Sequence, residues 1–317
     1  MVIVAMRSIE WTFTKRPLRR YELPEGRDSP VERPLSVSNV LIDSSDLLCN
    51  LRGIGWSWSP NPFLRKSTPR SPPPSIASIW AKTLLKVMVV DVSQYIMQSI
   101  CPSMEKPGGG SLFDPTLPLF PRTRLGALAA IFGGVWVCAA VDSLYHVGML
   151  AGRLLLRQPA WQWPPLFRRP WMATSIRDFW SDRWHQYLRH IFVVFGARPG
   201  GKFLGRAGAV MGAFSVSALI HYLGLWGSGH GTEFHIDAGF FLLMGLGAVM
   251  EGAFQQVTGL RVGGWFGWLW TMSWTLGWGT LLIDGWARRG LFAAHFLPDK
   301  LRLGKMLIDG AVSLFTK

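Results

Sequence analysis

Two histidines lie in contexts that suit acid–base chemistry. His221 falls inside an apolar run, Phe214–Leu223. In such a run the neutral imidazole is favoured over the imidazolium, and a neutral imidazole accepts a proton from a hydroxyl group. An ionisable side chain in an apolar segment is usually functional, whereas the structural alternative is a histidine bonded to a backbone carbonyl. His221 is therefore the leading candidate for a general base.

Each histidine has a polar neighbour one helical turn earlier in the sequence. Ser217 precedes His221 on the same helical face, where it can orient the imidazole ring. Asp182 stands in the same relation to His185 and can hold its tautomer. The alternative for His185 is an interfacial histidine whose only role is to pair with Asp182.

The segment around His185 predicts one amphipathic helix from Ser175 to His190. Ser175 followed by Asp178 is a capping-box-like start. At 100° per residue one stripe is polar and the opposite stripe is rich in tryptophan, which suits the lipid headgroup level. The polar stripe holds Asp178, Asp182, His185 and Arg189, and the apolar stripe holds Ile176, Trp180, Trp184, Tyr187 and Ile191. An ordinary interfacial helix with solvated charges is the alternative.

Composition indicates a membrane protein. Only 16% of the 317 residues are charged, 17 are tryptophan, and the mean hydropathy is +0.21. The net charge of +14 comes from basic residues between apolar runs, without a nucleic-acid-binding motif, so we expect no nucleic-acid partner. Three distant cysteines indicate neither a disulfide framework nor a zinc site, and we expect no metal.

The apolar runs predict an all-α, polytopic transmembrane protein. Spans are expected at 125–150, 207–226, 236–256 and 262–283, whereas 79–100 is either a span or an interfacial helix. Gly208 and Gly212 form a GxxxG step that allows another helix to approach closely. The basic connection 152–206 should be cytosolic, but the alternation of spans then puts Arg288 and Arg289 on the opposite side.

Two regions follow from this pattern. Residues 1–78 are expected to form a polar, basic, partly disordered cytosolic N-terminal region. Residues 79–317 are expected to form a multi-span membrane domain, with a signature core at about 161–247.

The stretch WPPLFRRPWMATSIRDFWSDRWHQYLRHIF resembles the core signature of the wax-synthase-like branch of the membrane-bound O-acyltransferases. The resemblance rests on Asp178-Phe179-Trp180, on Arg183-Trp184-His185 and on the intramembrane His221. Ala218 replaces the usual glycine, and Asp182 stands where a basic residue is common. The loop RGIGWSW, Arg52–Trp58, is similar to one in fungal members that acylate specialised metabolites, and the resemblance covers about 51–256.

The resemblance implies an acyl-CoA-dependent O-acyltransferase of the endoplasmic reticulum membrane. His221 would be the base and His185 a second polar group beside the acyl-transfer centre. Supporting motif residues would be Asp178, Trp180, Asp182, Arg183, Trp184 and Ser217. Coenzyme A phosphates would meet Arg168, Arg169, Arg177, Arg189 and Arg198, although the positive-inside rule alone predicts the same arginines.

The implied donor is acetyl-CoA as co-substrate, with no bound cofactor. The implied acceptor is a lipophilic alcohol, such as a terpenoid or meroterpenoid of secondary metabolism, and membrane lipids are the other partners. A long-chain wax ester synthase is the alternative enzyme, and the oligomeric state stays open. Family members usually carry further spans before this region, so we expect a shortened chain.

Two other classes of membrane protein are alternatives, a transporter and a di-iron enzyme. A transporter would line its pathway with polar span residues such as Asp91, Asp142, His146 and Glu251. A di-iron enzyme would use histidine pairs, but His185 and His190 would lie about 140° apart on a regular helix.

Overall fold

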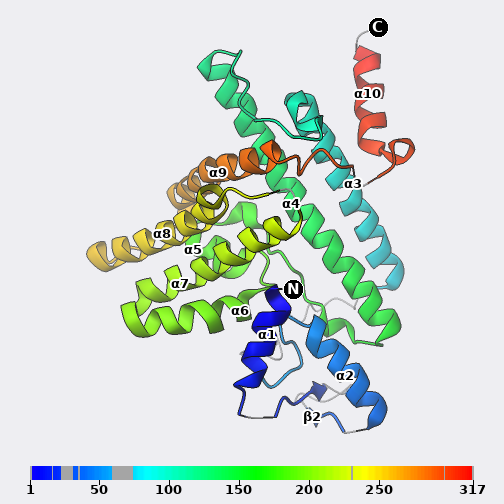
Figure 1. Ribbon diagram of the computed structural model, residues 1–317, viewed down its shortest axis with the longest axis vertical. Coiled ribbons are helices and arrows are strands. Elements are labelled where there is room, and N and C mark those ends of the chain that lie inside the picture. The colour runs from blue at the N-terminus through cyan, green and yellow to red at the C-terminus, as the bar shows by residue number, and fades with distance from the viewer. Residues whose placement is uncertain are drawn as a thin grey trace.

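The computed structural model describes residues 2–15, 17–22, 31–34, 36–58, 74–229, 231–295 and 297–315. Apart from a two-stranded antiparallel ribbon, its regular elements are helices (Figure 1). They are α1 (Val2–Thr12), β1 (Tyr21–Glu22), β2 (Val31–Glu32), α2 (Val37–Cys49), α3 (Ile76–Ile100), α4 (Leu119–Leu155), α5 (Ile176–Asp178), α6 (Arg189–Phe192), α7 (Arg198–Gly227), α8 (Phe234–Thr258), α9 (Gly264–Arg288) and α10 (Leu303–Phe315). Single π-helical turns cover Phe179–Arg183 and Val193–Ala197.

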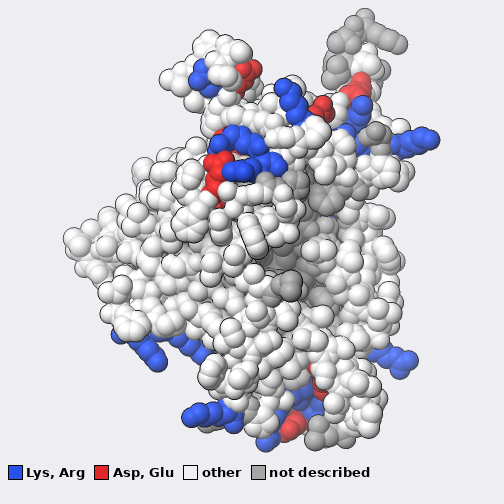
Figure 2. Space-filling view, viewed as in Figure 1, with Lys and Arg blue, Asp and Glu red and all other residues white. Residues whose placement is uncertain are grey.

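Three helical stretches of the described chain are long and apolar enough to cross a membrane: Leu119–Leu155, Arg189–Gly227 and Phe234–Thr258, of which the second is divided by a kink at Leu204 and Gly205. Charged side chains gather toward the top and bottom of the face in Figure 2, and a broad uncharged band lies between them. Such a surface is typical of a protein that lies in lipid. The prediction of an all-α polytopic membrane protein is confirmed.

Polar residues of the long helices are bonded within the fold. α3 lies along α4 (Figure 1). Lys86 of α3 pairs with Asp142 of α4. Asp91 accepts from Arg302 and from the backbone N–H of Gly304, which ties α3 to the start of α10. These carboxylates hold neighbouring elements together, as the cost of burying an unpaired charge in lipid requires.

The two arginines that conflict with the positive-inside rule are paired with acids. Arg288 lies 3.2 Å from Glu233 and 3.0 Å from Asp284, and Arg289 lies 3.4 Å from Glu233. Glu233 comes from the connection between α7 and α8. Because carboxylates neutralise these cations locally, Arg288 and Arg289 indicate the cytosolic side less strongly than unpaired arginines would.

A helical hairpin replaces much of the predicted connection 152–206. The chain is helical from Arg189 to the kink at Leu204 and Gly205, where Gly205 has φ +58° and reverses the chain. The second arm then runs to Gly227. Arg198, Lys202 and Arg206 are exposed near the turn, on an arm of the hairpin instead of a loop.

Glycines allow the two arms of the hairpin to touch. A Cβ on Gly212 would lie 2.3 Å from the carbonyl oxygen of Gly196, and one on Gly208 would lie 2.3 Å from that of Gly200. The close approach predicted from Gly208 and Gly212 therefore exists, and its partner is the preceding arm with a GxxxG step of its own.

We expect Gly212→Val to destabilise the hairpin, because the new Cβ meets backbone that cannot move without separating the arms. The cost of such overpacking is about 1–3 kcal/mol or more. The measurement is the thermal midpoint of the detergent-purified protein. Gly224→Val is the matched control, since a Cβ there has no neighbour within 4 Å. Equal midpoints for the two variants would contradict the packing argument.

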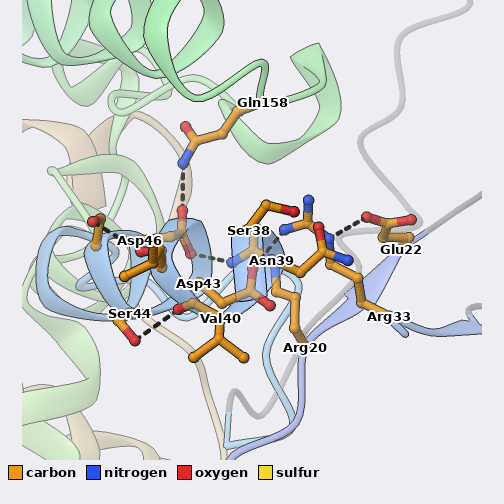
Figure 3. Close-up of polar contacts among 12 residues, drawn as sticks. Arg20, Glu22, Arg33, Ser38, Asn39, Val40, Asp43, Ser44, Asp46 and Gln158 are labelled. Carbon is orange, nitrogen blue, oxygen red and sulfur yellow. Dashed lines mark hydrogen bonds and ion pairs between the residues drawn. The ribbon is translucent and has the colours of Figure 1, made fainter. Parts of the chain in front are cut away.

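The N-terminal region packs onto the rest of the fold. Asp46 of α2 is 3% exposed and accepts from Arg20 and from Gln158, which follows α4 (Figure 3). It also accepts from Trp56 Nε1 at 2.6 Å. Arg52 donates to the carbonyl of Pro164 at 2.9 Å. The described residues 2–15, 17–22 and 36–58 are thus helical, extended or turn segments with contacts to later parts of the chain, and the division of the chain at residue 78 stays a prediction. Residues 23–30 and 59–73 lie outside the described residues.

Replacing Asp46 with alanine should lower the free energy of unfolding by about 3–5 kcal/mol, because Arg20 would stay buried without its counter-charge. Thermal melting in detergent reports the change. Asp43→Ala removes a more exposed partner of Arg33 and should cost about 1 kcal/mol or less. Equal melting temperatures for Asp46→Ala and Asp43→Ala would contradict this expectation.

Candidate functional site

The predicted single helix from Ser175 to His190 is wrong. After α5, the π-helical turn Phe179–Arg183 ends in a hydrogen bond from Trp184 N to Phe179 O of 2.7 Å. Trp184 is then extended, with φ −72° and ψ 157°, and helix resumes at Arg189. The wider turn and the extended residue change the direction of every later side chain, so the predicted polar stripe does not form.

The start of the segment is capped as the sequence predicts. Ser175 Oγ accepts from the backbone N–H of Asp178 at 2.9 Å. The N–H groups of Ile176 and Arg177 donate to Glu251 of α8, at 2.6 and 3.1 Å. All three N–H groups of the first turn therefore have acceptors, and the role of Glu251 was not visible in the sequence.

Asp178 has a different partner from the one that a capping box predicts. Its Oδ2 accepts from Arg183 Nε at 2.6 Å. Arg183 also donates toward the carbonyls of Arg168 and Arg169, at 3.3 and 3.4 Å. The Asp178–Arg183 pair therefore closes the π-helical turn. Through Arg183 it also attaches the preceding stretch around Arg168 and Arg169 to that turn.

The two motif tryptophans, Trp180 and Trp184, pack against each other and against Phe179 of the turn. Trp184 stacks on Phe179 with ring centroids 5.2 Å apart. Trp180 meets Phe214 of α7 and Phe240 of α8 edge-on, at 5.8 and 6.1 Å. They fix the π-helical turn against the α7–α8 pair that carries His221.

Asp182 does not hold His185. Its Oδ1 pairs with Arg168 at 2.8 Å on the exposed side of the segment. The Nδ1 atom of His185 is buried and has no hydrogen-bond partner among the described residues. The π-helical turn is the physical reason, because it removes the one-turn relation between the two side chains. His185 packs instead against Trp184 and Phe167, with centroid distances of 5.7 and 5.9 Å.

The pKa of His185 is lowered from 6.5 to about 4, first by burial and then by the neighbouring His221. His185 is therefore neutral at physiological pH. A neutral ring retains one N–H donor and one acceptor nitrogen for a reactant in the cavity.

Backbone geometry defines the tautomer of His221. Its Nδ1 lies 2.7 Å from the carbonyl oxygen of Ser217, and a carbonyl can only accept a hydrogen bond. Nδ1 therefore carries the proton in the neutral ring, and Nε2 keeps its lone pair. Ser217 Oγ is more distant at 3.4 Å, and Phe241 stacks on the ring at 4.1 Å.

Both histidines line one cavity of about 330 Å³, within the range of small-molecule sites. Its polar lining also includes Ser217, Arg177 and Arg189. Its remaining lining is mostly apolar and comes largely from the hairpin arms: Trp180, Ser181, Trp184, Gln186, Phe192, Val193, Ala197, Ala209, Val210, Ala213, Phe214 and Ala248.

Of the five arginines predicted to bind coenzyme A, two line the cavity and three do not. Arg177 and Arg189 line the cavity, whereas Arg168 pairs with Asp182 and Arg169 caps a short turn in a left-handed conformation, with φ 51°. Arg198 lies one residue beyond the cavity residue Ala197 on the first hairpin arm. The lining of the cavity by small apolar residues of the hairpin was not predicted from the sequence. A second GxxxG step, Gly196 and Gly200, was the sequence signal for this close helix pair.

No group of three or more His, Cys, Asp or Glu side chains placed to hold a metal occurs in the described part of the chain. His190 is bonded to Glu10 of α1. His230 lies outside the described residues.

His185 should make stability depend on pH. Because its folded pKa lies below the ordinary value of 6.5, its contribution is full above that value and is lost as pH falls toward about 4. The thermal midpoint in detergent should therefore drop less between pH 7.5 and 5 for His185→Gln than for the unmodified chain. Identical pH profiles would show that the folded ring protonates normally.

Comparisons with known proteins point to one family. Residues 163–243 match the membrane bound O-acyl transferase family. The O-mevalon transferase yanI of Aspergillus niger is 22% identical over 269 residues, which are 78% of this chain and 57% of the relative. The acetyltransferase spyB of Aspergillus fumigatus is 28% identical over 142 residues, 42% of this chain and 24% of the relative.

A plant enzyme gives a shorter match. The long-chain-alcohol O-fatty-acyltransferase of Simmondsia chinensis is 32% identical over 95 residues, 27% of each chain. The chain thus spans less than two thirds of the length of these curated relatives. The family match falls on the segment and helices that build the histidine-lined cavity, so over residues 163–243 this chain is similar to the membrane bound O-acyl transferase family.

Proposed function

We propose that this protein transfers an acyl group from acyl-CoA to a hydroxyl of a lipophilic acceptor. The observation that carries the proposal is the tautomer of His221. With Nδ1 bonded to Ser217 O, the free lone pair of Nε2 belongs to a ring that lines the cavity. A general base needs that arrangement.

The reaction follows from this geometry. His221 Nε2 accepts the proton of the acceptor hydroxyl while the hydroxyl oxygen attacks the thioester carbon. The tetrahedral intermediate then breaks its C–S bond, and the coenzyme A thiolate takes the proton back from His221. The neutral ring of His185, in the same cavity, is the candidate N–H donor to the developing oxyanion.

Arginines of the cavity suit the coenzyme part of the donor. Arg177 and Arg189 offer guanidinium groups to phosphate oxygens. Arg189 is held by hydrogen bonds to Ser181 O at 3.1 Å and Gln186 Oε1 at 3.4 Å. Arg168, Arg169 and Arg198 are placed outside the cavity and are weaker candidates for phosphate contacts.

Acetyl-CoA is our first candidate donor, and a terpenoid or meroterpenoid alcohol is the first candidate acceptor. The support is the similarity to the acetyltransferase spyB, together with the apolar lining of the cavity. Similarity to an O-mevalon transferase and to a long-chain-alcohol O-fatty-acyltransferase makes the mevalonyl and long-chain donors the alternatives. We place the activity in the endoplasmic reticulum membrane.

Replacing His221 with alanine should lower acyl transfer by about 10²–10⁴-fold, the usual contribution of a general base. The assay supplies microsomes containing the chain with labelled acetyl-, mevalonyl- or palmitoyl-CoA and with terpenoid or fatty alcohols, and it measures labelled ester. The donor that gives ester distinguishes the alternatives.

His235→Ala is the matched control, because that side chain is 79% exposed and outside the cavity. It should leave ester formation unchanged at equal membrane abundance. Ester formation that survives in His221→Ala would remove His221 as the base, and no ester from any donor with the unmodified chain would contradict the proposed activity.

A further inference from the structure

Glu251 is a buried carboxylate that binds backbone N–H groups. It lies in α8, is 7% exposed, and has no Lys or Arg partner within ion-pair distance among the described residues. Its Oε1 accepts from Ile176 N at 2.6 Å and from Trp270 Nε1 at 3.0 Å, and its Oε2 accepts from Arg177 N at 3.1 Å.

These contacts require two acceptor oxygens. The amides of Ile176 and Arg177 begin α5, where no earlier turn supplies carbonyls, so without Glu251 both would lose their acceptor and the buried amide of Ile176 would have no partner. A glutamine keeps the size of the side chain but turns an NH₂ group toward one of these N–H donors. Water would compete with an exposed glutamate for these N–H groups. Glu251 is buried instead, and Trp270 of α9 donates a hydrogen bond to it.

The position of Arg177 depends on this contact. Its backbone N–H is bonded to Glu251, and its side chain lines the cavity with both histidines. Ala248, one turn before Glu251 on α8, lines the same cavity. Glu251 therefore lies next to the part of the cavity wall that Arg177 and Ala248 form.

We propose that Glu251 is a positioning residue that holds Arg177 in place to bind the phosphate groups of coenzyme A. The inference rests on the proposed function and adds a residue that neither contacts the reacting atoms nor belongs to the signature stretch. Glu251 acts by setting the backbone at Arg177.

The test is a double-mutant cycle on the full chain purified in detergent, with binding of labelled free coenzyme A as the measurement. Glu251→Gln and Arg177→Ala should each weaken binding by about tenfold, and the double variant should bind no more weakly than either one. In acyl transfer, Glu251→Gln should raise KM for the donor while kcat stays close to that of the unmodified chain.

Trp270→Phe is the matched control, since it removes one donor to Glu251 and leaves both backbone contacts. It should change coenzyme A affinity less than about twofold. If Glu251→Gln does not accumulate in the membrane, Glu251→Asp takes its place in the cycle, because it keeps the charge but shortens the reach.

Additive losses in the double variant would overturn the inference, and so would unchanged coenzyme A binding in Glu251→Gln. A lower melting temperature without coupling to Arg177 would make Glu251 a purely structural residue. If the unmodified chain neither binds coenzyme A nor forms ester, the proposed function itself fails, which is a distinct outcome.

Discussion

Every backbone polar group in a lipid environment must find a partner inside the protein, and this constraint governs the signature segment. A regular helix would pair its own backbone N–H and C=O groups. Here the helix is interrupted at Trp184, which leaves backbone donors and acceptors without helical partners on both sides of the interruption. Side chains supply the missing partners. Glu251 accepts the first N–H groups, and Gln186 donates to the carbonyls of Trp180 and Trp184, at 3.1 and 2.7 Å.

The break has a chemical consequence. A continuous helix would place His185 beside Asp182, where the carboxylate would favour the charged imidazolium. In the structure Asp182 belongs to Arg168, and His185 is left among aromatic rings beside His221. His185 is therefore a neutral imidazole in the cavity, beside the Nε2 lone pair of His221 that proton transfer from a hydroxyl requires.

Small residues give the cavity its shape. Gly196 against Gly212 and Gly200 against Gly208 bring the hairpin arms into backbone contact. The alanines beside these glycines then form a wall with room for a ligand, and that wall leads along α7 to Ser217 and His221. The same residue types that allow close helix packing in lipid thus also leave space for a lipophilic reactant.

Local sequence determined much of this protein. Apolar runs of sufficient length predicted the long helices, Ser175 predicted the start of α5, the glycine spacing predicted a close helix contact, and His221 stood out as an ionisable group in an apolar run. Each depends on residues within a few turns of one another, so periodicity and capping rules suffice.

Tertiary structure alone decided the break at Trp184, the partners of Asp182 and Glu251, and the docking of the N-terminal region through Asp46. The helical period at 175–190 favoured a continuous helix, but packing of Trp180 against Phe214 and of Trp184 against Phe167 outweighed that local preference. Glu251 and Arg177 are far apart in the chain, as are Asp46 and Gln158. Contacts at such separations leave no period in the sequence, because they arise only when helices formed independently are packed together.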